Sequence, residues 1–420
     1  MLTLVSDGLN YLQSQNVAGL VALFWFVFLF DVPRVVLAFV TAAFFAEDDY
    51  SDVDTAALGR ITAVIAGHNE EDDIERCVLC LLEQSLPPDE IIVVSDGSTD
   101  GMKKKLADLL RRGLIQRAHG TDLRAGKAAA VNLAERLSSG DIIINVDCDC
   151  SFDRHALRNI VRPFLDPRVG AVSGNIILRN PFASVVCSFQ AIEYLVSISL
   201  GKRALGVIDQ VTCASGAFGA FRDRAMQEVG GLDAGGGEDL DVTLRMRRAG
   251  WKVAFAHDAI CYTDAPASLS AFVRQRFRWE RDAIRLRYRK HVDFMNPFSN
   301  RFKASELIHE IEFLIFNVVA AVALPFYVVW LFATYGDLAP VILLGAQMVL
   351  LIVDLIMFAL AAYVTPKARA VPLFPFVIGF SLFNGLFMRV IRSMAYLQEW
   401  VLKASYSDSY VPDKVHLVRQ

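Results

Sequence analysis

The sequence predicts an α/β domain with a mostly parallel sheet, combined with α-helical transmembrane segments. Hydrophobic residues make up 54% of the 420 residues, which is more than a soluble domain of this size usually carries. They concentrate before residue 46 and after residue 307, whereas the stretch between alternates short apolar strands with helical segments. Such alternation predicts parallel strands that are covered by helices on both faces.

The N-terminal segment, residues 1–50, is expected to cross the membrane. Val17–Ala46 is apolar except for Asp31, Pro33 and Arg34. The part before Asp31 is shorter than the ~20 residues that a crossing helix needs. We therefore expect one long helix that is kinked at Pro33, with a shallow hairpin as the alternative.

Residues 51–290 form the predicted α/β domain. Strands are expected at Ile61–Ala66, Ile91–Val94 and Gly140–Val146, and a helix at Glu71–Gln84. Acidic motifs follow the second and third of these strands. Because ligands of such sheets bind beyond the carboxyl ends of the strands, the sequence places the functional site at this edge.

Three apolar segments follow the domain, at Ile311–Thr334, Leu338–Val364 and Val371–Met388. The first two are long enough to cross a bilayer, with a tight turn between them. Prolines interrupt the start of the third segment, and Arg389 and Arg392 mark its end. The sequence therefore leaves two alternatives for the third segment, crossing and not crossing the membrane.

Basic residues set the expected orientation. Lys367 and Arg369 lie between the second and third apolar segments, and Arg281–Lys290 precedes the first. Positive charge favours the cytoplasmic side, so we expect a multi-pass protein of a bacterial inner membrane with its α/β domain in the cytoplasm. The expected divisions after the domain are an interfacial amphipathic segment at 291–306, transmembrane helices at 307–398 and a tail at 399–420.

Charge and cysteine content exclude two classes of site. The formal net charge of −4 argues against a nucleic-acid binder, which needs a basic surface. Cys77 and Cys80 form a CxxC pair, but no second pair or histidine cluster follows at zinc-ligand spacing. We interpret the pair as small apolar residues on a helix. The odd number of scattered cysteines fits a domain that lies in a reducing compartment.

The central chemical signal is Asp147-Cys148-Asp149, directly after the third strand. Two carboxylates one residue apart can converge on Mg²⁺ or Mn²⁺, which also bridges diphosphate oxygens. Such a cation would act as a Lewis acid on a departing nucleoside diphosphate. Alone, the motif is equally typical of a surface turn. Its position at the end of a strand is what supports a metal site.

Other strand-end residues are candidates for nucleotide binding. His68 and Glu70 follow the first strand, Asp96 follows the second, and Lys127 opens a helix. An imidazole can stack on a base, carboxylates accept hydrogen bonds from ring N–H and ribose groups, and a lysine at a helix N-terminus suits a phosphate. Taken singly, His68 is as typical of a loop and Lys127 of a solvated surface.

A glycine-rich turn at 235–237 leads into Glu238 and Asp239. Either carboxylate is a candidate general base that deprotonates an acceptor hydroxyl. The alternative is a carboxylate that only caps its helix.

The stretch Arg274–Lys290 is basic and amphipathic, and it carries Gln275, Arg278 and Trp279. Arg278 can hold a diphosphate, and Trp279 can stack on an acceptor sugar. A helix on the membrane surface explains the same pattern, and the two interpretations are compatible.

In their order along the chain, these motifs resemble the family 2 glycosyltransferases. The similarity is to the processive membrane branch, which includes cellulose, chitin, hyaluronan and poly-N-acetylglucosamine synthases, and it covers roughly residues 60–400. It implies a GT-A catalytic domain, a UDP-sugar donor, Mg²⁺ or Mn²⁺, and inversion at the anomeric carbon. The site residues that the resemblance implies are His68, Glu70, Asp96, Lys127 and Asp147 for the nucleotide, Asp149 with Asp147 for the metal, Asp239 with Glu238 for catalysis, and Gln275, Arg278 and Trp279 for the diphosphate and acceptor.

Departures from the family pattern narrow the set of synthases that the chain is expected to be similar to. Ser95 stands where many relatives have an aspartate, and Gly237 replaces the threonine of their Thr-Glu-Asp motif. Nothing after the last apolar segment resembles the gating loop of cellulose synthases. The compact layout is more similar to chitin-oligosaccharide, poly-N-acetylglucosamine or hyaluronan synthases.

The expected function is elongation of a β-linked polysaccharide from a UDP-sugar, with export through the membrane. Its partners are the donor, the growing polysaccharide and membrane lipid. As the donor sugar, glucose, N-acetylglucosamine and an alternating pair of sugars all fit these residues. Two alternatives remain open: a transferase that moves one sugar onto a membrane lipid, and a non-catalytic nucleotide-binding transport or scaffold subunit, towards which the intramembrane Asp354 points.

Overall fold

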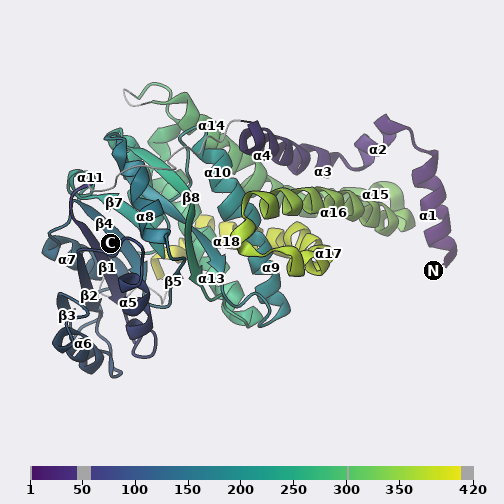
Figure 1. Ribbon diagram of the computed structural model, residues 1–420. Helices are drawn as coiled ribbons and strands as arrows, with labels where there is room; N and C mark the ends of the chain where they lie inside the picture. Colours follow the sequence, from purple (N-terminus) through teal and green to yellow (C-terminus); the bar gives the residue numbers. More distant parts are fainter. Residues whose placement is uncertain (1, 45–57, 300–301, 408–420) are drawn as a thin grey trace.

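The computed structural model describes residues 2–44, 58–299 and 302–407 (Figure 1). An α/β domain lies at one end of the molecule and long helices lie at the other. The end of the N-terminal segment after Phe44, the linker before the first strand and most of the tail lie outside the described residues.

The centre of the α/β domain is one eight-stranded sheet with the order β3-β2-β1-β4-β7-β6-β8-β5. Four of its seven strand pairings are parallel and three are antiparallel, so the sheet is mostly parallel, as expected. The strands are β1 (Ile61–Gly67), β2 (Glu90–Ser95), β3 (Arg117–Gly120), β4 (Ile142–Asp147), β5 (Ser151–Phe152), β6 (Val169–Leu178), β7 (Phe218–Arg222) and β8 (Lys252–Thr263).

Helices cover both faces of the sheet, because its central strands are apolar on both sides. Ala63 and Ile65 of β1 face a core beneath α5, α6 and α8, whereas Val64 faces a second core beneath α7, α11 and α12. The helices of the domain are α5 (Ile74–Leu82), α6 (Met102–Arg111), α7 (Lys127–Leu137), α8 (Ala156–Val161), α9 (Val185–Glu193), α10 (Gly201–Gly206), α11 (Asp223–Val229), α12 (Glu238–Ala249) and α13 (Leu269–Arg285). Cys77 and Cys80 lie on α5, as interpreted.

The register of the parallel strands brings the predicted motifs to one edge. Gly67 at the end of β1 pairs with Ser95 of β2, and Ala66 pairs with Asp147 of β4. The loops that follow β1, β2 and β4 therefore start side by side, which is where the sequence places the site.

The N-terminal helices are α1 (Leu2–Ser14), α2 (Val17–Leu23), α3 (Trp25–Phe30) and α4 (Val32–Phe44). The expected kink at Pro33 is wrong, because the chain bends by 82° between Val17–Leu23 and Trp25–Ala38. Pro33 is the second residue of α4, a position where the missing N–H of proline is tolerated. The break falls at Phe24, whose ring lies against Gly345.

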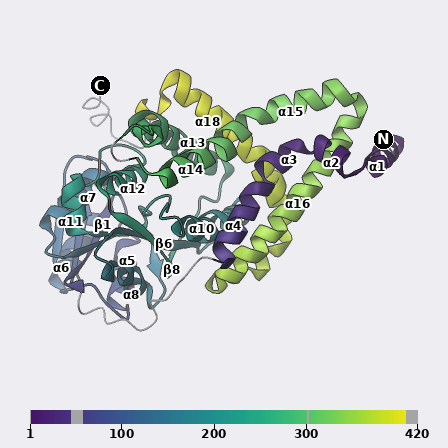
Figure 2. The ribbon, with the colours of Figure 1, turned by 90° about the horizontal axis from the view of Figure 1, so that it is seen from above.

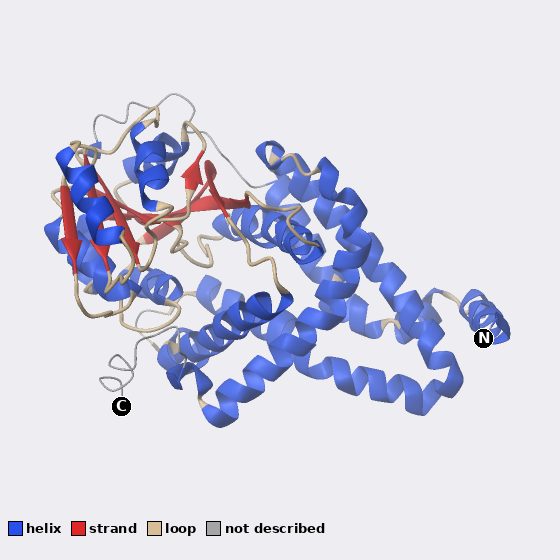
Figure 3. Cartoon of the chain, turned by 90° about the horizontal axis from the view of Figure 1, so that it is seen from below, coloured by secondary structure: helices blue, strands red, loops and turns tan. Residues whose placement is uncertain are grey.

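The C-terminal helices are α14 (Ala304–Phe313), α15 (Ala320–Tyr335), α16 (Ala339–Val364), α17 (Val377–Leu382) and α18 (Met388–Leu402). The expected turn between the first two apolar segments is present at Gly336, which has a φ of +51°, and α15 and α16 diverge from it (Figures 2 and 3). Among the described residues, two helical stretches are apolar and long enough to cross a membrane, Ala304–Val364 and Val371–Leu402, or up to three if the bent N-terminal pair is one span.

Arg389 and Arg392 do not close the third apolar segment, which corrects that expectation. The helix continues through both residues to Leu402. Arg389 pairs with Asp31 at 2.5 Å, and Arg392 pairs with Glu280 at 3.1 Å. Each arginine can remain inside an apolar helix because a carboxylate from a distant part of the chain faces it.

Candidate active site

The loops after β1 and β2 are joined by His68 and Asp96. Nδ1 of His68 lies 2.7 Å from the main-chain oxygen of Asp96. The buried carboxylate of Asp96 accepts hydrogen bonds from the N–H groups of Ala125 at 2.7 Å and Gly126 at 2.8 Å. Asp96 therefore fixes the loop that delivers Lys127 to the N-terminus of α7.

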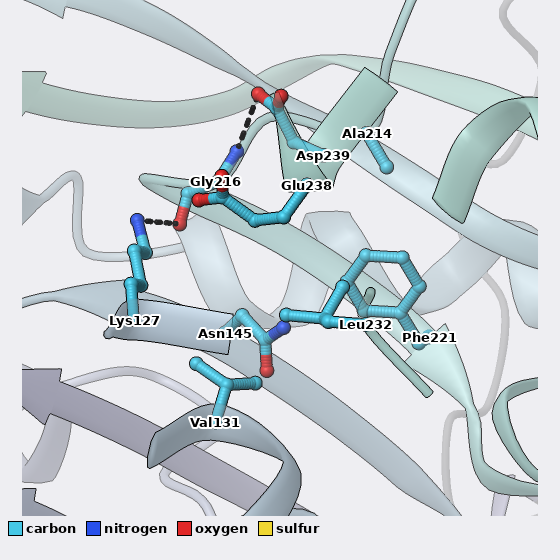
Figure 4. A pocket seen from close by; sticks show the side chains of 9 residues that line it. All are labelled: Lys127, Val131, Asn145, Ala214, Gly216, Phe221, Leu232, Glu238 and Asp239. Carbon is cyan, nitrogen blue, oxygen red and sulfur yellow. Dashed lines mark hydrogen bonds between the residues drawn. The ribbon is translucent and has the colours of Figure 1, made fainter. Parts of the chain in front are cut away.

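Lys127 connects two of the predicted acidic motifs. Its ammonium group pairs with Asp147 and donates a hydrogen bond to the main-chain oxygen of Gly216 at 3.2 Å. The N–H of Gly216 in turn donates to Oδ2 of Asp239 at 3.3 Å. Figure 4 shows this chain of contacts between Lys127, Gly216 and Asp239.

Asp149 is held from two sides. Oγ1 of Thr263, at the end of β8, donates to Oδ2 of Asp149 at 3.1 Å. Nη2 of Arg179 donates to the main-chain oxygen of Asp149 at 3.1 Å. Burial and the nearby charge of Asp147 raise the pKa of Asp149 above its usual range. The carboxylate is thus fixed in position while it faces a second negative charge.

Glu70 completes a crowded group of carboxylates. Burial, followed by the negative charge of Asp149, raises the pKa of Glu70 to about 7. Among the described residues, no cluster of three or more His, Cys, Asp or Glu side chains is arranged to hold a metal ion alone. Mg²⁺ commonly takes one or two carboxylates and completes its shell with substrate phosphates and water. Asp147 and Asp149 therefore fit a divalent cation that would be shared with a diphosphate, and Glu70 adds a third carboxyl group near them.

Glu238 and Asp239 lie at the start of α12 and border a small pocket (Figure 4). Burial raises the pKa of Glu238 to about 7, against the opposing effect of the Lys127 charge. Oδ1 of Asp239 accepts a hydrogen bond from the N–H of Leu240 at 2.8 Å. The pocket is lined by Lys127, Val131, Asn145, Ala214, Gly216, Phe221, Leu232, Glu238 and Asp239.

Gln275, Arg278 and Trp279 lie on α13, as the sequence predicts for an amphipathic helix. Among the described residues, no hydrogen bond or ion pair joins Gln275 or Trp279 to the acidic motifs. The Trp279 ring instead stacks under the guanidinium group of Arg276, 4.5 Å from its centroid. Arg276 is buried and pairs with Glu193 at 2.7 Å, so this neighbour of the predicted residues fixes the tryptophan.

Comparison with known proteins identifies the family. The sequence model described as "Glycosyltransferase like family 2" matches residues 59–281, more than half of the chain. The chain belongs to this family. The resemblance noted in the motifs is thereby confirmed.

Curated relatives of the chain include poly-β-1,6-N-acetyl-D-glucosamine synthases. The protein from Staphylococcus aureus (strain MSSA476) is 30% identical over 230 residues, which cover 54% of this chain and 55% of that protein. The protein from Staphylococcus epidermidis (strain ATCC 35984) is 27% identical over 221 residues, 52% of this chain and 53% of that protein. The chain spans about half the length of the curated relatives it matches.

A solved structure with the same fold is the mannosyltransferase PcManGT from Pyrobaculum calidifontis, determined with GDP-Man and Mn²⁺. The TM-score is 0.63 at 20% identity, and the match covers 91% of this chain and 99% of that one. The α/β domain therefore has the GT-A fold, as the motifs imply.

Gly237 stands where the family motif has threonine, and the structure gives the reason. Its φ is +68°, a left-handed conformation that is unfavourable for a β-branched residue. A Cβ atom at this position would also lie 2.8 Å from Cδ1 of Leu286. Glycine thus permits this turn into α12.

We expect Gly237→Ala to lower both stability and activity, since it adds a steric clash to about 1–2 kcal/mol of backbone strain. Gly230→Ala is the matched control, because Gly230 has a φ of +80° but open space around its Cα. Thermal unfolding in detergent and turnover are measured for both. Equal melting temperatures and equal rates in the two variants would show that the contact with Leu286 is unimportant.

Asp241, the third carboxylate of the glycine-rich motif, has a structural role. It accepts hydrogen bonds from Nε2 of His291 at 2.8 Å and Nε of Arg245 at 2.8 Å, and it pairs with Lys290 at 2.7 Å. Burial favours a raised pKa, but the bonds from His291 and Lys290 outweigh it and hold the pKa of Asp241 well below its usual range.

A depressed pKa predicts the pH dependence of this contribution to stability. The stabilisation is fully present above the unfolded-state pKa of about 3.9 and is lost as the pH falls further towards the folded-state pKa. We expect Asp241→Asn to lower the melting temperature at pH 7, and this deficit to shrink below about pH 4. The exposed Asp72→Asn is the control. A deficit that stays constant over this pH range would contradict the assignment.

Two positioning residues were not predicted from the sequence. Lys202 is buried and donates hydrogen bonds to Oγ of Ser173 at 2.9 Å and Oγ of Ser215 at 2.6 Å. It thus supports the loop that presents Gly216 to Lys127 and Asp239. Arg179, which braces Asp149, pairs with Asp264 at 2.6 Å. Neither belongs to a recognisable motif, and only the fold brings them to the site.

Proposed function

We propose that the protein is an inverting, metal-dependent glycosyltransferase that elongates a β-linked polysaccharide from a UDP-sugar. The observation that carries this proposal is the continuous set of contacts from Asp147 through Lys127 and Gly216 to Asp239. These contacts support the assignment of a metal and diphosphate site next to the proposed base. The similarity to poly-β-1,6-N-acetyl-D-glucosamine synthases supports N-acetylglucosamine as the transferred sugar.

In the proposed mechanism, His68, Glu70 and Asp96 form the nucleotide end of the site. Lys127 and Arg278 balance the charge of the diphosphate. Asp149 and Asp147 would hold a divalent cation, which would supply Lewis-acid stabilisation to the leaving UDP. Asp239, with Glu238 as its neighbour, accepts the proton of the acceptor hydroxyl. That hydroxyl attacks the anomeric carbon from the face opposite to the leaving UDP.

The acceptor end is assigned to α13. Trp279 is partly exposed and fixed by its stack on Arg276, so its free face is available to a sugar ring. Gln275 contributes a buried side-chain oxygen that has no hydrogen-bond partner among the described residues. Such an oxygen can accept a hydrogen bond from the acceptor sugar.

We place the enzyme in a bacterial inner membrane, with the catalytic domain on the cytoplasmic side. The apolar stretches Ala304–Val364 and Val371–Leu402 support membrane insertion, and the basic link at Lys367 and Arg369 supports the orientation. Export of the product through the membrane region is part of the proposal. Asp354, the residue that suggests a transport subunit, lies near Ser381 of α17, so we account for it as a polar group between two packed helices.

The first test measures UDP release by the purified protein with Mn²⁺ or Mg²⁺ over a panel of UDP-sugars. We expect release from UDP-N-acetylglucosamine, and its loss when the cation is chelated. Release from another UDP-sugar alone would reassign the donor. Absence of release from every donor would favour the non-catalytic subunit.

A further inference from the structure

The glycine-rich segment that precedes α12, residues 230–237, is weakly determined by its own sequence. Five of its eight residues are glycines, and ordering a glycine costs more conformational entropy than ordering any other residue. Gly237, which caps the N-terminus of α12, has no side chain that could bond the free N–H groups of the first turn. Contacts from outside the segment therefore have to fix the start of α12, where the proposed base lies.

The side chain of Asn132, on α7, makes the first of these contacts. Its Nδ2 donates a hydrogen bond to the main-chain oxygen of Leu232 at 2.8 Å, and its Oδ1 accepts one from the N–H of Leu232 at 2.7 Å. A side-chain amide that bonds both main-chain groups of one residue fixes the position and the orientation of that residue. Gly231 permits the approach, because a Cβ atom there would lie 2.6 Å from Oδ1 of Asn132.

Leu232 connects this contact to the pocket beside the proposed base. Its side chain lines the pocket that Glu238 and Asp239 border (Figure 4), and so does Val131, the neighbour of Asn132 on α7. The same helix begins with Lys127, which pairs with Asp147. Helix α7 thus holds the diphosphate side of the proposed site and the segment that leads to the base.

Arg285, the last residue of α13, holds the segment from another side. Its Nη2 donates hydrogen bonds to the main-chain oxygen of Gly236 at 2.5 Å and to Oδ1 of Asp282 at 2.9 Å. Arg285 and Asp282 are both buried, and a Cβ atom at Gly236 would lie 2.3 Å from Oδ2 of Asp282. Hydrogen bonds from a charged donor are stronger than those between neutral groups. Helix α13, which carries the predicted acceptor residues, is therefore joined to the residue two positions before α12.

A third contact of the segment, between Lys290 and Asp233, is different in kind. The two side chains are 36% and 49% exposed. Exposed ion pairs contribute little to the stability of a conformation. The buried contacts of Asn132 and Arg285 are therefore expected to fix the segment, and the ion pair of Asp233 is not.

We infer that Asn132 and Arg285 are positioning residues for the transfer reaction. Through the main chain of Leu232 and Gly236, they set the location of the base Asp239 relative to the diphosphate and to the acceptor. This inference rests on the catalytic role proposed for Asp239. Loss of either contact leaves the base in the protein but displaces it, and a displacement of about 1 Å can lower a rate by about 10²-fold.

The first test is Asn132→Asp, which keeps the size of the side chain and its acceptor oxygen but cannot donate to the carbonyl of Leu232. We expect kcat with UDP-N-acetylglucosamine and Mn²⁺ to fall by about 10- to 100-fold, while the KM for the donor stays within about threefold of the parent. UDP titration by calorimetry counts the intact sites, so a folding defect is separated from slow turnover. A near-normal kcat per UDP site would overturn the role of Asn132.

Asn159→Asp is the matched control. Asn159, on α8, also donates from its amide to a main-chain oxygen, that of Asp258 at 3.0 Å, but it does not contact the glycine-rich segment. The same chemical change is expected there to leave kcat per UDP site unchanged. A loss equal to that of Asn132→Asp would show a general effect of the substitution and contradict the inference.

Arg285 is tested by two substitutions. Arg285→Lys keeps a cation beside Asp282 and is expected to retain more of the rate per UDP site than Arg285→Gln does. An equal or larger loss in Arg285→Lys would contradict the role of Arg285.

The decisive measurement combines Asn132→Asp, and separately Arg285→Lys, with Asp239→Asn. Residues that act through Asp239 cause no further loss once its carboxylate is gone, so we expect each double variant to have the residual rate of Asp239→Asn alone. Losses that multiply would show that Asn132 and Arg285 act independently of the base and would overturn the inference. A near-normal rate in Asp239→Asn itself would overturn it together with the role of Asp239. UDP release by the parent protein shows separately whether the proposed transferase activity stands.

Discussion

Asp239→Asn is expected to lower the rate of sugar transfer by about 10²–10⁴-fold, the usual contribution of a general base. The substitution preserves the size of the side chain, and its amide oxygen can still accept the hydrogen bond from Gly216 that the structure shows at 3.3 Å. What is lost is the capacity to accept the proton of the acceptor hydroxyl. UDP affinity, measured by calorimetry beside turnover, is expected to stay within about threefold of the parent, because Asp239 is assigned to the acceptor and a change of this size is less than the ~1 kcal/mol of one typical hydrogen bond.

The matched control is Asp233→Asn, which removes a carboxylate from the same glycine-rich segment. Asp233 pairs with the exposed Lys290, so we expect its loss to leave turnover nearly unchanged. Glu238→Gln separates the two adjacent carboxylates. A near-normal rate in Asp239→Asn together with a large loss in Glu238→Gln would transfer the role of base to Glu238.

The second large effect is expected from Asp149→Asn, which should lower turnover by about 10²-fold or more, because charge on the leaving diphosphate loses its main stabilisation. An amide binds a hard cation more weakly than a carboxylate does. We therefore also expect a higher Mn²⁺ concentration for half-maximal rate and a weaker Mn²⁺ signal in titrations with UDP present.

Thr263→Val is the control for the position of Asp149. It removes the hydrogen bond of 3.1 Å to Oδ2 but leaves the carboxylate in place, so a smaller loss is expected at saturating Mn²⁺. If Asp149→Asn titrated with Mn²⁺ as the parent does, the metal would have to lie elsewhere.

The sequence was sufficient for the parts of the fold that depend on local pattern. Apolar strands followed by polar turns predicted β1, β2 and β4, and parallel pairing then required His68, Asp96 and Asp147 to meet at one edge. The helix starts at Lys127 and Glu238 were equally predictable, because a glycine precedes each. These signals are short-range and need no knowledge of the rest of the chain.

Features that depend on long-range contacts were not predictable. The sequence pattern predicts that an apolar segment ends at Arg389, because its partner Asp31 lies more than 350 residues earlier in the chain and cannot be recognised locally. A proline within an apolar stretch predicts a kink at Pro33, but its effect depends on its position within the helix, and the bend occurs at Phe24 instead. Lys202 has no motif around it, and its contact with Ser215 exists only because the fold brings α10 next to the loop that carries Ser215 and Gly216.

The central claim, elongation of a polysaccharide, is tested most directly by the size of the product. The purified enzyme in lipid nanodiscs is incubated with radiolabelled UDP-N-acetylglucosamine and Mn²⁺, and the products are separated by size at low extents of donor consumption. The account predicts long chains while most of the donor remains, together with their loss in Asp239→Asn. A single labelled sugar attached to extractable lipid, without chains, would contradict it and identify a lipid glycosyltransferase.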